Sequence, residues 1–231
     1  MPDLFPTTHS TWLADRVAQA PDEARAHVMS RYFDPLCAYV RASTNLRVLG
    51  EPSDLVNAFL AARMPDATYL ARWSASGLPL RRWLANGLLL HARNAVLASR
   101  RRAARHEATD VGELDRTARL RAADHETDAL LALERRWAVR TVTETHEQIR
   151  AELHSEGRDA WWELFRLHTV HGKAYAEACA ITGVALGSAS SIHRQVVDRL
   201  RGALVAILER DGIRREDIDA ELASMQDLLE G

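Results

Sequence analysis

The chain has 231 residues but contains little cysteine, one lysine and no long apolar run. Its two cysteines, Cys37 and Cys179, lie far apart without a CxxC partner, so we expect reduced core residues and no metal site. No apolar stretch approaches the roughly 18 residues that a membrane span needs. The N-terminal MPDLFPTTHSTW lacks a basic region followed by an apolar one. These absences predict a cytoplasmic protein with no membrane segment.

Catalytic motifs are also absent. The sequence contains no HExxH, no GxSxG and no glycine-rich phosphate loop. His168 and His171 form an HxxH without cysteine or carboxylate partners, and the expected role of these histidines is helix-end capping. Trp161 and Trp162 are expected to fill the core of the C-terminal half. We therefore expect no enzyme, no cofactor and no metal.

Alternation typical of strands is missing, alanine and leucine dominate, and glycines and prolines fall between the periodic segments, not inside them. The predicted fold class is all-α. Helices are expected over residues 11–20, 22–42, 53–62, 78–102, 127–153, 159–169, 174–181, from 188 onward, and 215–229.

The same pattern predicts two small helical domains joined by an acidic linker. The domains are residues 1–102 and 127–208, the linker is 103–126, and an acidic helical tail follows at 209–231. We expect the tail to pack on the protein's own body. The alternative is that the tail meets a regulator.

The net charge of −2 is unevenly distributed. Residues 78–105 contain seven arginines and no acid, whereas residues 107–128 contain seven acids and three arginines. Residues 209–230 contain eight acids and three arginines, so basic and acidic blocks alternate. Arginine suits bidentate contacts to phosphate and guanine, although a genome-wide codon bias would give the same count.

The basic block is predicted to form an amphipathic helix. One side carries Arg82, Asn86, Arg93 and Arg100. The opposite side carries Leu80, Leu84, Leu88 and Ala95. Trp83 and Asn94 flank the cationic side, and grooves for single-stranded DNA combine such groups for stacking and backbone contacts. The alternative is a core position for Trp83 and a solvated face for the arginines.

Residues 172–208 have the layout of a helix-turn-helix. A first helix turns Tyr175, Ala178 and Cys179 inward, and Gly183 stands where a left-handed residue ends a helix. The second helix has an apolar stripe made of Ile192, Val196, Val197, Leu200 and Leu204. Its other face is polar and carries Ser190, Ser191, His193, Arg194, Gln195 and Arg199. These residue types suit base edges and phosphates; the alternative is an ordinary helical hairpin.

Five segments, in chain order, carry a family resemblance. They are RYFDPLCAYVRA at 31–42, EPSDLVNAFLAARM at 51–64, YLARWSASGLPLRRWLANGLLLHARNAVLASRRRAAR at 69–105, RRWAVRTVTETHEQIRAEL at 135–153 and YAEACAITGVALGSASSIHRQVVDRLR at 175–201. The first three resemble region 2, and the last two region 4, of bacterial sigma factors of the extracytoplasmic-function (ECF) type in the sigma-70 family. The tail IRREDIDAELASMQDLL resembles the short C-terminal helix of one subgroup.

The resemblance implies a factor that binds core RNA polymerase, through its β′ and β subunits, and directs it to promoter DNA. An anti-sigma factor or other regulator is a further candidate partner. Implied docking residues for core polymerase are Asp54, Leu55, Asn57 and Phe59. Implied residues for the melted −10 strand are Arg81, Arg82, Trp83, Asn86, Arg93, Asn94 and Arg100. Implied residues for the −35 duplex are Lys173, Ser188, Ser190, Ser191, Arg194, Gln195 and Arg199.

The chain also departs from the family pattern. Asn57 stands where glutamine is usual, Leu60 where an aromatic is common, and Leu80 where phenylalanine often precedes the arginine. The recognition helix has two serines where a lysine is frequent, and the helix-turn-helix carries only about +2. Two alternatives therefore stay open: a stand-alone helix-turn-helix regulator, and a sigma-like interaction module that has lost promoter binding.

Overall fold

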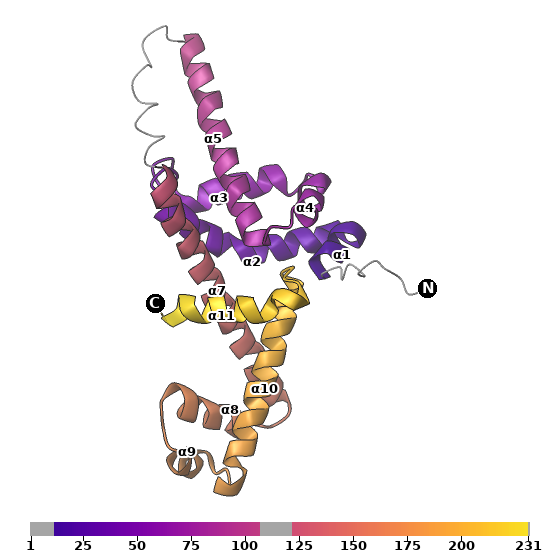
Figure 1. Ribbon diagram of the computed structural model, residues 1–231, viewed down its shortest axis with the longest axis vertical. Coiled ribbons are helices and arrows are strands. Elements are labelled where there is room, and N and C mark those ends of the chain that lie inside the picture. Colours follow the sequence, from indigo (N-terminus) through magenta and orange to yellow (C-terminus); the bar gives the residue numbers. More distant parts are fainter. Residues whose placement is uncertain (1–11, 107–121, 231) are drawn as a thin grey trace. The chain divides into compact units, whose positions relative to one another are not determined.

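The computed structural model describes residues 12–106 and 122–230, and every element in these ranges is helical (Figure 1). The N-terminal elements are α1 (Trp12–Gln19), α2 (Pro21–Ala42), α3 (Pro52–Arg63), α4 (Ala67–Ser74) and α5 (Leu80–His106). The later elements are α7 (Ala122–Ser155), α8 (Asp159–Phe165), the π-helical η1 (Arg166–Val170), α9 (Tyr175–Thr182), α10 (Leu186–Arg210), the 3-10 turn η2 (Arg215–Asp217) and α11 (Ile218–Glu230). The all-α prediction is confirmed for this part of the chain. None of the described helices combines the length and apolar character that crossing a membrane requires.

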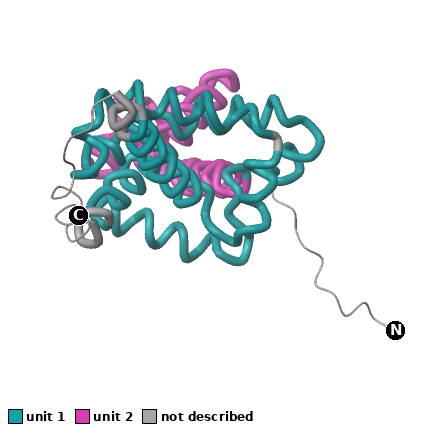
Figure 2. Tube along the Cα trace, turned by 90° about the horizontal axis from the view of Figure 1, so that it is seen from above, with its two compact units in different colours: residues 1–138, 210–231 teal, residues 139–209 magenta. Residues whose placement is uncertain are grey.

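The helices form two compact units (Figure 2). Unit 1 consists of residues 1–138 and 210–231, and unit 2 of residues 139–209. These boundaries differ from the expected domains, because α7 and α10 each continue from one unit into the other. The tail belongs to unit 1 and so packs on the protein's own body. Of the expected linker, residues 103–106 and 122–126 are helical, and 107–121 lie outside the described residues.

Both stretches of unit 1 contribute to its apolar core. The largest fully buried side chains there are Trp137, Tyr32, Tyr39, Phe59, Leu13, Leu36, Leu46, Leu60, Leu80, Leu84, Leu88 and Leu133. The tail adds the buried Ile213, Ile218 and Met225. Burying a side chain of this size contributes roughly 1.5–3 kcal/mol. Unit 1 therefore depends on residues 210–231 for part of its stability.

Local signals explain where several helices of unit 1 begin. Prolines occupy the first turn of α2 and α3, where the missing N–H has no helical partner to lose. Asp66 caps α4, because its carboxylate accepts the Thr68 N–H at 2.9 Å. The sequence did not predict α4, which is only eight residues long.

Proline and glycine also lie inside helices, contrary to the prediction. Pro35 lies within α2, where it is buried, and Gly87 lies within α5. A proline ring removes one helical hydrogen bond, so Pro35 is tolerated where core packing offsets that loss. Gly87 has a packing reason, since its α-carbon faces the Tyr69 hydroxyl and the Phe59 ring.

Unit 2 has two adjoining apolar clusters. One consists of Leu164, Leu167, Ala178, Cys179, Ala189 and Ile192, and the other of Ile149, Leu153, Phe165, Val196 and Ala203. Trp161 and Trp162 pack against them, as predicted. Gly183 has φ +74° and donates its N–H to Cys179 O at 2.9 Å, which confirms the predicted left-handed end of α9. Val197 was assigned to the apolar stripe but is 40% exposed, because it lies beside the buried Val196 on the outer side.

Candidate nucleic-acid interface

The N-terminal half of α10 has one buried face and one polar face. Ala189, Ile192 and Val196 are buried, at the three- and four-residue spacing of a helix side. The predicted polar residues Ser188, Ser190, Ser191, Arg194 and Gln195 are all exposed. Short hydroxyl and amide side chains beside an arginine can donate to and accept from base edges. The N-terminal half of α10 thus presents an exposed polar face.

Two of the three predicted cations in unit 2 are already paired. Lys173 forms an ion pair with Glu177, one turn away. Arg199 donates to both carboxylate oxygens of Glu156, at 2.7 and 3.1 Å, and these bonds lower the pKa of Glu156. The pair ties α10 to the turn after α7. Arg194 has no ion-pair partner among the described residues, so it is the available cation of this face.

A histidine and aromatic cluster lies behind the polar face. His193 was expected to face outward, but its ring stacks on Phe165 at 5.8 Å and lies 5.1 Å from the His168 ring. Its Nε2 is 2.8 Å from the Thr169 hydroxyl. His168 in turn stacks on Tyr175 at 3.9 Å. His193 follows the buried Ile192 and therefore sits at the edge of the packed face, which its polarity concealed.

Acid is expected to destabilise this cluster. Burial lowers the pKa of His193, the nearby His168 lowers it further, and burial lowers the pKa of His146. The unfolded chain then binds protons more readily, so stability is lost as pH falls through about 6.5 toward the folded pKa values. Hydrogen-exchange protection factors in α10 should be smaller at pH 5 than at pH 7.5. The His193→Gln variant should show a weaker pH dependence; an unchanged one would remove His193 as the cause.

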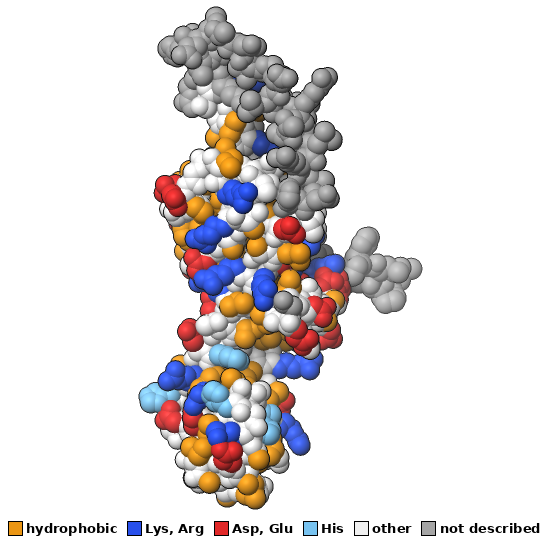
Figure 3. Space-filling model, turned by 90° about the vertical axis from the view of Figure 1, so that its left-hand side faces the viewer, with side chains coloured by type: hydrophobic (Ala, Val, Ile, Leu, Met, Phe, Trp, Pro, Cys, Tyr) orange, Lys and Arg blue, Asp and Glu red, His pale blue; other side chains and the backbone are white. Residues whose placement is uncertain are grey.

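The two histidines of the HxxH pair contact groups within unit 2. The Nδ1 of His168 lies 2.8 Å from the carbonyl oxygen of Lys173, so it donates there, close to the end of η1. His171 accepts instead from the Arg166 guanidinium. Histidine side chains are visible on the surface of unit 2 in Figure 3. Nowhere in residues 12–106 and 122–230 do three or more potential ligands gather as a metal site.

In unit 1, the first half of α5 packs and the second half projects beyond the other helices (Figure 1). Leu80, Leu84 and Leu88 are buried as predicted, whereas Ala95 is exposed because it belongs to the projecting half. Asn86, Arg93 and Asn94 are exposed. Arg93 has no ion-pair partner within the described ranges. Arg100 lies in α5, but its side chain is outside the described part.

The N-terminal end of α5 differs from the expected nucleic-acid face. Arg81 is only 7% exposed and pairs with Glu221 and Glu134. Arg82 is half exposed, and it also pairs with Glu134 at 3.0 Å. In the structure these two guanidinium groups are thus held by carboxylates. Their distant partners could not be identified from the helical periodicity.

Trp83 is half-buried and packs against Tyr69, with ring centroids 5.6 Å apart. Its Nε1 is buried without a hydrogen-bond partner, and so is the Tyr69 hydroxyl. Burial raises the pKa of Tyr69 to about 12, so the hydroxyl stays protonated at neutral pH. Trp83 therefore belongs partly to the core, as the alternative interpretation held.

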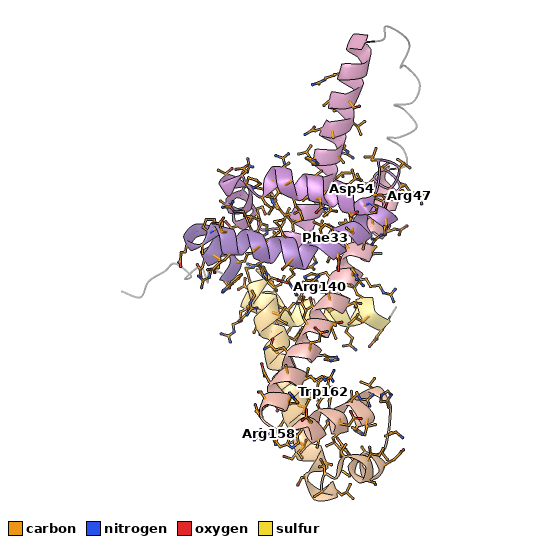
Figure 4. The ribbon with its side chains drawn as sticks, turned by 180° about the vertical axis from the view of Figure 1, so that it is seen from behind. Phe33, Arg47, Asp54, Arg140, Arg158 and Trp162 are labelled. Atoms are coloured by element: carbon orange, nitrogen blue, oxygen red, sulfur yellow. The ribbon has the colours of Figure 1, made fainter. Side chains whose placement is uncertain are left out.

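The predicted docking residues on α3 divide into exposed and buried positions. Asp54, labelled in Figure 4, and Asn57 are exposed on neighbouring turns, and Leu55 is half-buried. Phe59 is 0% exposed, and its ring centroid lies 6.2 Å from that of Tyr69 and 6.0 Å from that of His91. Because Phe59 is a core residue, only the other three can contact a partner directly.

In unit 2 the candidate interface is the exposed polar face of α10. In unit 1 the candidate residues are the exposed polar residues of α5 and the exposed Asp54 on α3. Comparison with known proteins adds no relative, since no protein-family model, no curated protein and no solved structure matches this chain.

Proposed function

We propose that the chain is an RNA polymerase sigma factor, which binds core polymerase and directs it to promoters. The helix-turn-helix is the observation that carries this proposal. Its left-handed Gly183 fixes the angle between α9 and α10, and the buried Ala178 and Ala189 allow the two helices to pack closely. That packing leaves the polar start of α10 free to enter a major groove, where such helices read base edges.

The exposed side of α5 supports a second contact in the same function. Asn86, Arg93 and Asn94 provide amide and guanidinium groups on a helix that projects from unit 1. Such groups can track the backbone of a melted strand. Capturing a strand and reading a duplex require no covalent chemistry, so the proposed work is binding alone.

The small number of available cations on α10 favours this proposal over a stand-alone regulator. A protein that binds free duplex needs several cations on phosphates, since each one adds to affinity through counterion release. The face of α10 offers Arg194, while Lys173 and Arg199 are engaged in ion pairs. Such a surface suits delivery to DNA by a larger partner.

Co-purification with core RNA polymerase, followed by run-off transcription from genomic fragments, tests the proposal. Core binding with initiation that depends on the protein would support a sigma factor. Specific duplex binding without core binding would favour the stand-alone regulator. No binding to either would favour the interaction module that has lost promoter binding.

The Asp54→Arg variant is expected to weaken core polymerase binding by at least about tenfold. Asp54 is an exposed acid, so reversing its charge places repulsion in the docking surface without disturbing the core. Asp227→Arg on α11 is the control, because it makes the same charge change at another exposed helical position of unit 1. Equal affinities for both variants, measured by fluorescence anisotropy, would remove α3 from the docking surface.

A further inference from the structure

A buried polar network attaches the tail to unit 1. Its centre is Asp211, in the turn after α10, which is 1% exposed. The carboxylate forms an ion pair with the buried Arg31 and lies 3.1 Å from His27 Nε2. It also accepts the Trp137 indole N–H at 3.0 Å. Asp211 therefore joins the tail to both α2 and α7.

The network continues from Trp137 to the start of α5. The Arg81 guanidinium lies over the Trp137 ring, 4.6 Å from its centroid. Its Nη2 is 2.8 Å from Glu221 Oε1 on α11, and its Nε is 3.8 Å from Glu134 Oε1 on α7. The same Glu134 oxygen is 3.0 Å from Arg82. Two carboxylates thus hold the two arginines that begin the basic helix.

The contacts to Arg81 leave one of its donors without a hydrogen bond. The Arg81 Nε is buried and has no hydrogen-bond acceptor, so Glu221 and Glu134 leave part of its donor capacity unused. An arginine guanidinium offers donors in a fork that fits phosphate as well as carboxylate. A phosphate group could therefore replace the Glu221 carboxylate at Arg81, provided that α11 moves away.

We propose that residues 210–231 form an intramolecular clasp over a polyanion-binding surface. In this arrangement Glu221 occupies the place of a backbone phosphate of single-stranded nucleic acid at Arg81. Opening the clasp removes Glu221 from Arg81 and so adds this cation to the exposed cations of α5. The inference rests on the proposed function only in assigning strand binding to α5.

Two charge reversals on α11 test the clasp in the full chain. Glu221→Arg places a like charge beside Arg81 and should displace α11 there. Asp227→Arg makes the same change on the exposed side of the same helix. We expect the first variant to bind a mixed-sequence single-stranded oligodeoxynucleotide at least about tenfold more tightly than the second. Its salt dependence should be steeper by about 0.7, since each added phosphate contributes about 0.7 on single strands.

A second pair of variants, which neutralise the charge without reversing it, separates opening of the clasp from misfolding of the Glu221→Arg variant. Glu221→Gln and its control Asp227→Asn keep the side-chain shape, and hydrogen exchange of the α11 amides reports opening independently of DNA. Faster exchange in Glu221→Gln, together with tighter strand binding, would support the clasp. Faster exchange with unchanged strand affinity would overturn it, while core polymerase binding would still decide the proposed function. Unchanged α11 exchange in both Glu221 variants would also overturn it.

Discussion

Replacing Gly87 by alanine is expected to lower the free energy of unfolding of unit 1 by about 1–3 kcal/mol. In most helices the same change stabilises, because alanine exceeds glycine in helix propensity by up to about 1 kcal/mol. At Gly87 an added Cβ would overlap the Tyr69 hydroxyl and lie 3.2 Å from two carbons of the Phe59 ring. Both rings are buried, so neither can move without disturbing α3 or α4. Urea unfolding followed by circular dichroism measures the loss.

Tyr69→Phe should rescue the Gly87→Ala variant. The Tyr69 hydroxyl is buried without a hydrogen-bond partner, so removing it costs little and also removes the most severe overlap. Gly202→Ala in α10 is the matched control, since an added Cβ there meets nothing within 4 Å and helix propensity alone should act. A double variant as unstable as Gly87→Ala alone would show that the Tyr69 hydroxyl is not the obstacle.

The Asp211→Ala substitution is expected to lower the free energy of unfolding by about 3–5 kcal/mol. This is the largest effect predicted for a single polar side chain of this protein. The change removes the carboxylate that pairs with the buried Arg31 and accepts the Trp137 indole N–H. Measuring urea unfolding at pH 7 tests this expectation. Asp227→Ala should change the stability by less than about 0.5 kcal/mol, because it is exposed. Similar losses in both variants would contradict a central role for Asp211.

The features that the sequence predicted correctly depend on nearby residues. The buried side of α5 followed from leucines four residues apart, and the end of α9 followed from one glycine in a left-handed conformation. The burial of Arg81 could not be predicted in this way. It depends on Glu134 and Glu221, which reach α5 only through the packing of α7 and α11. The same holds for the unit boundaries, because α7 gave no local break where unit 1 ends.

In the candidate site, too, features set by nearby residues were predictable and features set by distant residues were not. Exposed polar positions on α10 were predictable, because helical periodicity assigns them once the buried Ile192 and Val196 are known. Which cations are available was not predictable, since Arg199 is paired with Glu156 in the turn after α7. Phe59 illustrates the opposite error. Its resemblance to a docking position concealed its role in the core.

The composition of unit 1 from two separated stretches has a consequence for folding during synthesis. Arg31 and Asp211 are 180 residues apart, and all of unit 2 is translated between them. Unit 2 has mostly local contacts and can fold as soon as it leaves the ribosome. Arg31 cannot contact Asp211, and Arg81 cannot contact Glu221, until the tail has been synthesised. On the nascent chain, the helices of unit 1 therefore lack the carboxylates of Asp211 and Glu221 until the acidic tail emerges.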